Sequence, residues 1–163
     1  MTETKVYVGT YGKYNSGSSY GEWLTLSAYA SKEEFLEACH AVHEDEHDPE
    51  FMFQSTEGPT FGMISEDDID GDIFNLLSQL DDDEIEMYEA YRKNVSDGTF
   101  RDAQDAYVGT YQSDEEFAEE LAEEMGFITS NAKWPYTCID WEQAARDLMY
   151  DYFQVDGHYF HNY

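Results

Sequence analysis

The alternation of apolar and polar positions along the chain predicts short strands and helices of moderate length. In the first part we expect a strand at 4–11, a second strand at 23–26, a helix from Ser31 to about Glu46 and a short strand at 51–54. A turn rich in Gly, Ser and Asn separates the first two strands. Asp48-Pro49 is expected to end the helix, because proline cannot continue it.

Helix-type spacing dominates the middle of the chain. Apolar residues at 69, 73, 76, 77 and 80 predict a helix that begins at Ser65. Asp81 and the acids after it are expected to start a second helix, and Thr99 is expected to cap a short third one. The last part predicts a helix from Ser113 to Met125, ended by Gly126, then a helix from Asp140 to about Phe153 and an aromatic strand at 155–163.

A five-residue segment, Tyr-Val-Gly-Thr-Tyr, occurs twice, at 7–11 and at 107–111. Each copy is followed by a helix start with the same spacing, at Ser31 and at Ser113. In both, the serine can cap the helix while the glutamate three residues later reaches back, which is a capping box. We therefore expect the first and third parts to share a strand-then-helix plan.

The predicted elements indicate an α+β chain of three small domains in a row. Residues 1–61 form a mixed α/β N-terminal domain, 62–103 a helical middle domain and 104–163 a mixed α/β C-terminal domain. The 163 residues hold 37 acids against 8 bases, a net charge of -29 with a pI near 4.1. The three parts hold 11 acids and 3 bases, 13 and 3, and 13 and 2, so every part contributes to the negative charge.

This composition excludes several classes of function. Apolar residues make up 41% and aromatic residues 17% of the chain, too many for a disordered acidic tail. Lysine and arginine are too scarce for binding to nucleic acid or to an anionic membrane. No apolar run approaches the roughly 18 residues of a spanning helix, and the start lacks a secretion signal, so we expect a cytoplasmic protein. Cys39 and Cys138 are expected to be free and buried.

His43-Glu44-x-x-His47 matches the zinc-protease pattern H-E-x-x-H. Asp45 and Glu46 make the same turn very polar and Pro49 stops the helix, so a solvated helix end is the simpler interpretation. A zinc-dependent hydrolase stays open as an alternative, as does an acidic, salt-adapted cytosolic protein of another function. Phosphate-loop and nucleophile-elbow motifs are absent from the sequence, so we expect neither an enzyme nor a cofactor.

The helix after Ser113 carries two rows of glutamate spaced four residues apart, Glu115, Glu119 and Glu123 beside Glu116, Glu120 and Glu124. Four residues rise about 6 Å, so the two rows place one carboxylate per roughly 3 Å, close to the roughly 3.4 Å between phosphates on a DNA strand. The four like-charge pairs should each destabilise the helix by about 0.2–0.5 kcal/mol. Such crowding also predicts carboxyl pKa values above their usual range. The residues therefore favour presentation of charge as the function.

Four segments of the chain resemble the ArdA family of antirestriction proteins. They are 13–17 (Lys-Tyr-Asn-Ser-Gly) with Gly21 and Trp23, 48–54 (Asp-Pro-Glu-Phe-Met-Phe-Gln), 113–117, and 139–141 with 146–148. Together they span nearly the whole chain. The chain departs from the family at Ser55, where an acid is expected after Gln54.

The resemblance implies a DNA mimic encoded on mobile genetic elements. Such proteins occupy the DNA-binding groove in the methyltransferase core of type I restriction-modification enzymes of the bacterial host, and they block restriction and often modification. The resemblance also implies three domains along an elongated, curved, acidic body, and a homodimer formed end to end. Two chains of -29 carry the charge of roughly 99 Å of duplex.

Under this mechanism, carboxylates stand in for DNA phosphates and pair with lysine and arginine of the enzyme. The candidate phosphate-mimicking acids are Glu33, Glu34, Glu37, Glu44, Asp45, Glu46, Asp67, Asp68, Asp70, Asp72, Asp81, Asp82, Asp83, Glu84, Glu115, Glu116, Glu119, Glu120, Glu123 and Glu124.

Overall fold

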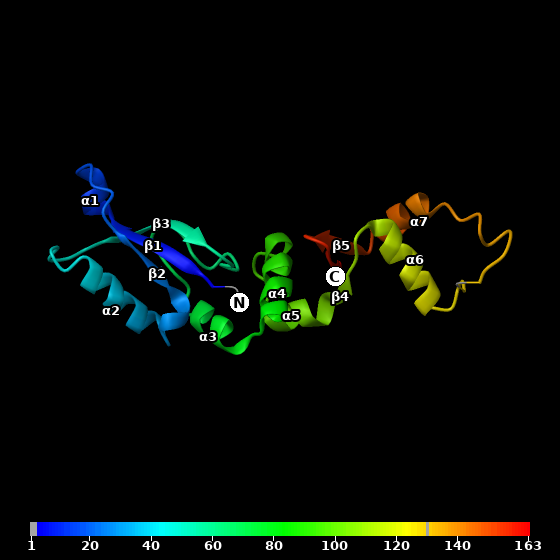
Figure 1. The fold of residues 1–163 in the computed structure, drawn as a ribbon, viewed down its shortest axis with the longest axis horizontal. Coiled ribbons are helices and arrows are strands. Elements are labelled where there is room, and N and C mark those ends of the chain that lie inside the picture. Colours follow the sequence, from blue (N-terminus) through cyan, green and yellow to red (C-terminus); the bar gives the residue numbers. More distant parts are fainter. Residues whose placement is uncertain (1–2, 130) are drawn as a thin grey trace. The chain divides into compact units, whose positions relative to one another are not determined.

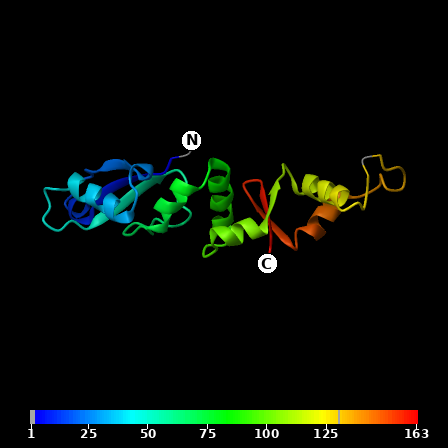
Figure 2. The ribbon, with the colours of Figure 1, turned by 90° about the horizontal axis from the view of Figure 1, so that it is seen from below.

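The computed structural model describes residues 3–129 and 131–163, and the chain divides into two compact units, Met1–Ser96 and Asp97–Tyr163. Within the described residues the fold is α+β, with seven α-helices and two three-stranded antiparallel sheets (Figure 1 and Figure 2). The expected fold class is therefore confirmed, whereas the division into three domains at 61 and 103 stays a prediction. None of the described helices combines the length and the apolar character needed to cross a membrane.

The first unit is built on a sheet of strand order β2-β1-β3, with helix α2 beside it (Figure 1). Its elements are β1 (Lys5–Thr10), α1 (Tyr11–Asn15), β2 (Glu22–Thr25), the 3-10 helix η1 (Leu26–Ala28), α2 (Lys32–Val42), β3 (Phe51–Glu57), α3 (Asp72–Gln79) and α4 (Asp82–Asn94). Phe35 of α2 is fully buried, and its ring centroid lies 5.9 Å from that of Phe53 on β3 and 5.6 Å from that of Phe74 on α3. These contacts join the sheet and both helices in one core. Cys39 is free and buried in this unit, as expected, whereas Cys138 in the second unit is free but exposed, so the expectation that it is buried is wrong.

Helix α2 is shorter than the sequence predicts. It ends at Val42 rather than near Glu46, and His43 occupies its C-cap. The imidazole of His43 is fully buried and lies 2.9 Å from the backbone oxygen of Val8 on β1. The helix therefore ends at a contact with the sheet, and its cap lies six residues before Pro49, which was expected to end it.

The helix expected from Ser65 begins instead at Asp72. Between them the chain makes a tight turn, in which the Ser65 N–H donates to the oxygen of Asp68 at 2.9 Å. A backbone bridge pairs Ile64 with Ile69, and Ile69 is buried in this turn rather than on a helix. The acids after Ser65 therefore belong to a loop.

Helices α4 and α5 (Phe100–Ala106) start where the sequence predicts. The Asp81 side chain caps α4 by accepting a bond from the Glu84 N–H, and the Glu84 carboxylate accepts one from the Asp81 N–H at 3.0 Å. The Thr99 side chain caps α5 by accepting a bond from the Asp102 N–H, and the Asp102 carboxylate accepts one from the Thr99 N–H at 2.9 Å. Both are complete capping boxes, which satisfy backbone donors that a helix start leaves free.

The second unit has a sheet of strand order β4-β6-β5 and a pair of helices packed on each other, α6 and α7. Its elements are α5, β4 (Tyr107–Thr110), α6 (Asp114–Glu124), α7 (Trp141–Leu148), β5 (Tyr152–Val155) and β6 (His158–His161). The helix predicted from Asp140 begins as expected, with Asp140 as its cap, but it ends at Leu148 rather than near Phe153. The single strand predicted at 155–163 is wrong, because β5 and β6 form a hairpin. Asp156 and Gly157 at its turn have φ values of 51° and 83°. Asp-Gly is a preferred pair for a tight turn with two positive φ angles.

The repeated segment forms a strand in both units, as the shared strand-then-helix plan predicts. Each copy contains a register shift, between Tyr7 and Val8 against β3 and between Tyr107 and Gly109 against β6. The helix starts also correspond, because Phe35 and Phe117 each lie four residues after the capping serine and are fully buried. The surroundings differ, since β1 is the central strand of its sheet and β4 an edge strand.

Candidate functional site: the exposed carboxylates

The candidate acids lie almost entirely at the surface. All of them are exposed except Glu46, Glu84 and Glu116, which are half-buried. The structure thus places the predicted residues where a partner could reach them. Many of them fall into three groups, on α6, in local backbone bonds at helix starts, and in ion pairs with lysine, and the rest lie in loops, on α2 and in first helical turns.

Helix α6 carries the densest group. It spans 11 residues, and its inner side buries Phe117 and Ala118. The two predicted rows are exposed apart from the half-buried Glu116, with Glu115, Glu119 and Glu123 in one and Glu116, Glu120 and Glu124 in the other. The fold therefore uses one side of α6 for packing and leaves the glutamate rows to solvent.

Tyr111 locates the second row relative to the core. Burial is the largest cause of a raised pKa for the Tyr111 hydroxyl, and the charges of Glu124, Glu120 and Glu116 raise the pKa further. The Tyr111 ring also packs on Phe117, with centroids 4.9 Å apart. The second row thus borders the aromatic core of the unit.

Several candidate acids organise helix starts. Glu34 accepts a bond from the Ala30 N–H at 2.9 Å, and Glu116 accepts one from the Gln112 N–H at 2.6 Å. In both helix starts the glutamate therefore accepts from the N–H of the residue just before the capping serine. The predicted capping box, in which it would accept from the N–H of the serine itself, is wrong. Because these two carboxylates already accept hydrogen bonds from backbone N–H groups, they are less available to a partner than Glu119 or Glu123.

Other candidate acids pair with lysine. Lys13 Nζ lies 2.9 Å from Asp45 Oδ1 and 3.7 Å from Glu46 Oε1, and Lys32 Nζ lies 3.0 Å from Asp68 Oδ1. The hydrogen bond from Lys13 is the largest cause of a lowered pKa for Asp45, and the bond from Lys32 has the same effect on the pKa of Asp68. The expected rise in carboxyl pKa is wrong for these two groups, because each has a cation at hydrogen-bond distance.

The remaining candidates sit in loops and first helical turns. Asp67 accepts a bond from the Ser65 hydroxyl, and Asp70 accepts one from the Asp72 N–H at 3.0 Å. Asp82 and Asp83 lie in the first turn of α4, where the helix dipole favours negative charge. Glu33, Glu37 and Glu44 are exposed on α2 and just after it.

His43 does not fit the zinc pattern that it helps to form. It lies beyond the last residue of α2, so His43 and His47 do not follow each other on one helical turn. Both ring nitrogens of His43 are engaged, Nε2 with the Val8 oxygen and Nδ1 with Lys13 Nζ, each at 2.9 Å. Among residues 3–129 and 131–163, no group of three His, Cys, Asp or Glu side chains could hold a metal ion. The solvated helix end predicted here is also wrong for His43, which is buried.

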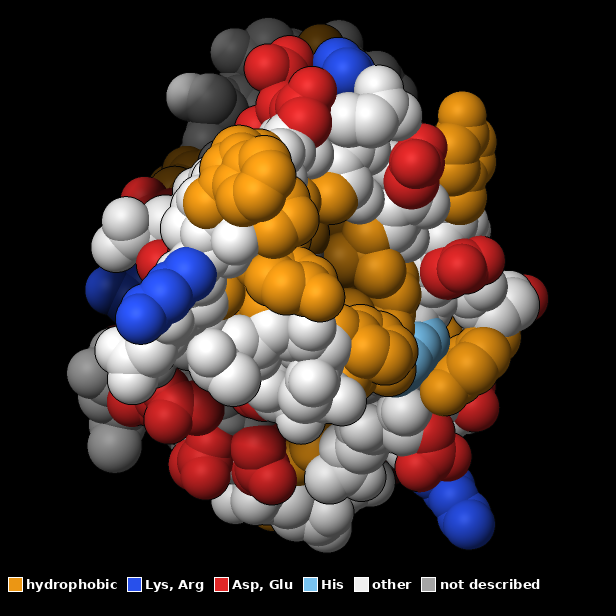
Figure 3. Space-filling model, turned by 90° about the vertical axis from the view of Figure 1, so that its right-hand side faces the viewer, with side chains coloured by type: hydrophobic (Ala, Val, Ile, Leu, Met, Phe, Trp, Pro, Cys, Tyr) orange, Lys and Arg blue, Asp and Glu red, His pale blue; other side chains and the backbone are white. Residues whose placement is uncertain are grey.

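Aromatic residues of the second unit divide between core and surface. Tyr159 and Phe160 are buried, whereas Tyr163 is exposed. Met125, Phe127, Trp134 and Tyr136 are also exposed apolar side chains. Figure 3 views the molecule from the right-hand side of Figure 1 and shows hydrophobic side chains gathered in the middle of that face, with Asp and Glu around them.

Comparison with known proteins settles the family. The model of the family described as "Antirestriction protein (ArdA)" matches residues 6–161. The chain belongs to the ArdA family. A search of curated proteins found no match. ArdA proteins are antirestriction proteins, which act as inhibitors of restriction enzymes and not as catalysts, and the chain takes its general function from this family.

The segments that carry the resemblance to ArdA are mainly structural. Ser113 caps α6 and Asp140 caps α7, each by accepting a backbone bond from the third residue of its helix. Phe51 begins β3, in the sheet of the first unit. These segments thus mainly build the scaffold, and most candidate acids lie outside them.

Proposed function

We propose that this ArdA protein mimics B-form DNA and competes with DNA for the DNA-binding groove of type I restriction-modification enzymes. In this mechanism its carboxylates pair with the lysine and arginine side chains that otherwise contact phosphates. Mimicry of the phosphate backbone uses no base contacts, so one inhibitor can act on enzymes that recognise different sequences.

The exposed glutamate rows on α6 are the observation that best supports this proposal. The helical rise places successive members of a row about 6 Å apart, and two rows together approximate the roughly 3.4 Å phosphate spacing of one DNA strand. Few cations of this chain are available to neutralise the rows, since the second unit contains only Arg101, Lys133 and Arg146. Arg146 lies 3.3 Å from Glu142 on its own helix.

The proposal includes the finer features that the resemblance implies. The protein acts in the cytoplasm of a bacterial host, is encoded on a mobile element and forms a homodimer. The three parts 1–61, 62–103 and 104–163 present charge in succession along an elongated, curved body. Small-angle X-ray scattering and sedimentation of the purified protein test the shape and the dimer.

Competition for a type I enzyme tests the central claim. A fluorescent duplex that contains the recognition site is bound to the methyltransferase core, and the protein is added at a series of salt concentrations. We expect displacement of the duplex by this protein at low salt. A panel of enzymes with different recognition sequences should respond alike.

Failure to displace DNA from any enzyme of the panel at low salt would refute the proposal. A reference acidic polymer, polyglutamate of similar net charge, separates shape from charge. If polyglutamate displaces DNA as strongly as the folded protein does, net charge alone explains the inhibition and the proposed mimicry is wrong.

A further inference from the structure

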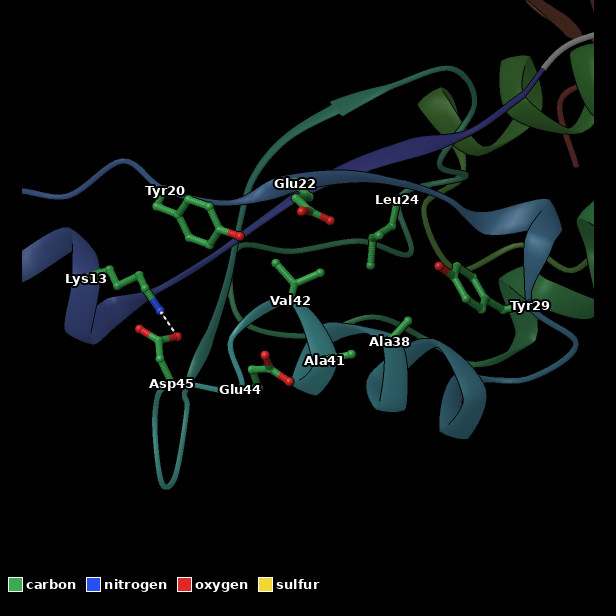
Figure 4. Close-up of a pocket in the computed structure, with 10 residues that line it drawn as sticks. All are labelled: Lys13, Tyr20, Glu22, Leu24, Tyr29, Ala38, Ala41, Val42, Glu44 and Asp45. Carbon is green, nitrogen blue, oxygen red and sulfur yellow. Dashed lines mark hydrogen bonds and ion pairs between the residues drawn. The ribbon is translucent and has the colours of Figure 1, made fainter.

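A groove lies in the first unit between strand β2 and helix α2 (Figure 4). Its volume is about 690 Å³. The apolar lining comes from Leu24 on β2 and from Ala38, Ala41 and Val42 on α2, with Tyr29 toward one end and Tyr20 toward the other. We call this feature the β2–α2 groove. It combines an apolar floor with an acidic border, unlike the wholly charged outer surface of α6.

Among the described residues, Lys13 is the one cation that lines the groove, and it is paired with an acid of the same chain. Lys13 Nζ lies 2.9 Å from Asp45 Oδ1 and 2.9 Å from His43 Nδ1, and it stands 5.6 Å from the centre of the Tyr20 ring. Figure 4 shows Lys13 and Asp45 joined at one end of the groove. Lys13 therefore adds little positive potential to the rest of the groove.

Two further carboxylates border the groove without a cation from the described residues. Glu22 belongs to β2 and Glu44 follows α2, so they come from the two elements that form the groove, and both are exposed. Burial is the largest cause of a raised pKa for the Tyr29 hydroxyl, and the neighbouring Cys39 and Glu22 raise it further.

We propose that the β2–α2 groove receives an arginine side chain from the type I restriction-modification enzyme. This inference rests on the proposed function, and it adds one defined contact to a surface otherwise described by charge alone. The aliphatic part of the arginine lies against Leu24, Ala41 and Val42. Its guanidinium group lies between Glu22 and Glu44.

The chemistry of the groove favours arginine over a simple cation. Arginine buries an aliphatic stem while its charged end meets carboxylates. Its planar guanidinium also stacks on aromatic faces and is more weakly hydrated than an ammonium group. Tyr20 supplies such a ring at the end of the groove nearer Glu22, and Glu22 and Glu44 supply acceptors. A DNA phosphate backbone offers no equivalent apolar floor, so the contact would distinguish this protein from DNA.

Filling the groove without changing charge gives the first test. Ala41 is exposed and lines the groove, so a tryptophan at this position can occupy it without replacing a core residue. We expect Ala41→Trp to weaken competition with DNA about tenfold, equivalent to about 1.4 kcal/mol. Ala28→Trp is the control, because Ala28 is exposed in the same unit and does not line the groove.

Neutralising the border gives the second test. The double change Glu22→Gln and Glu44→Gln should weaken competition about tenfold. The control is Glu50→Gln with Glu57→Gln, which alters net charge equally at two exposed acids of the same unit outside the groove. Both control acids lie outside the groove, so we expect this pair to weaken competition by about twofold, the lower end of the range for two exposed charges. Equal effects of the two double changes would overturn the inference.

Direct binding separates this inference from the proposed function. Methyl NMR spectra of the whole protein are recorded with N-acetyl-arginine methylamide, with the lysine analogue and with the uncharged norleucine analogue. We expect the arginine probe to shift the methyl signals of Leu24 and Val42 most, and Ala41→Trp to abolish the shift. Absence of shifts at these methyls would overturn the inference even if the protein competes with DNA.

The remaining outcomes are equally decisive. If the unsubstituted protein fails to displace DNA, the proposed function is wrong, whereas the NMR titration still tests the groove for arginine binding. If Ala41→Trp lowers the mass of the free protein in sedimentation, the groove holds a second copy of the chain and the inference is overturned.

Discussion

Glu119 and Glu120 are the middle members of the two rows on α6, so each faces a like charge four residues before it and four residues after it. Replacing both with glutamine removes all four like-charge pairs of this kind. Each pair destabilises a helix by about 0.2–0.5 kcal/mol. The double variant should therefore be more stable than the unsubstituted protein by roughly 1–2 kcal/mol at low salt.

The same double change should weaken inhibition. It removes two exposed carboxylates from the proposed phosphate-mimicking surface, and an exposed ion pair contributes about 0.2–1 kcal/mol. Competition with DNA should therefore weaken by about 2- to 30-fold. A gain in stability with a loss of inhibition is the result expected if the rows serve binding at the expense of the fold.

Urea denaturation followed by circular dichroism measures the stability change, at low salt and at 1 M salt. At 1 M the Debye length is about 3 Å, shorter than the separation between the paired charges, so the gain in stability should shrink. DNA competition at low salt measures the second effect on the same preparations.

A matched variant, Glu115→Gln with Glu124→Gln, makes the same change in net charge but removes only two of the four pairs. These residues lie near opposite ends of α6, where the helix dipole affects them in opposite directions. We expect about half the gain in stability. If the variant at 119 and 120 is no more stable than this control, or inhibits as well as the unsubstituted protein, the reasoning about the rows is wrong.

Three further changes test the scaffold. His43→Ala leaves the buried bonds to Val8 and Lys13 without their partner, and urea denaturation should show a loss of about 1–3 kcal/mol. Gly157→Ala places a side chain at a φ of 83°, and the same measurement should show a loss of about 1–2 kcal/mol. Because the pKa of Asp68 is lowered in the folded protein, its contribution to stability is present above the unfolded pKa of about 3.9 and is lost as the pH falls through the folded pKa. Lys32→Met should therefore raise the Asp68 pKa in carboxyl NMR titrations and reduce the loss of stability on the acid side.

Features with a local cause were predictable from the sequence. Asp81 and Thr99 start helices because their own side chains satisfy the backbone within three residues. The glutamate rows of α6 follow from helical spacing, and burial of Phe117 fixes which side of the helix faces inward. These interactions span at most a few turns, so a sequence pattern records them.

Features that depend on distant partners were not predictable. The end of α2 is set by His43, whose bonds reach Val8 and Lys13, more than 25 residues earlier in the chain. The pairing of acids with lysine was not predictable for the same reason, since Lys32 and Asp68 are 36 residues apart in the sequence. The hairpin at Asp156 was a different case, because its Asp-Gly pair is a recognisable turn signal in the sequence.

The capped start of α6 places two unequal constraints on how this sequence can diverge. Ser113 and Phe117 cannot move along the chain, because the serine hydroxyl must accept the Glu116 N–H and the phenylalanine ring must fill the core. The outward carboxylates can exchange Glu for Asp, or move by a turn, with little change in the field they create. Over many generations the scaffold should therefore remain recognisable while the individual charges drift. For inhibitors built in this way, relatedness is best judged from the residues that cap helices and fill the core, and inhibitory strength from the total surface charge.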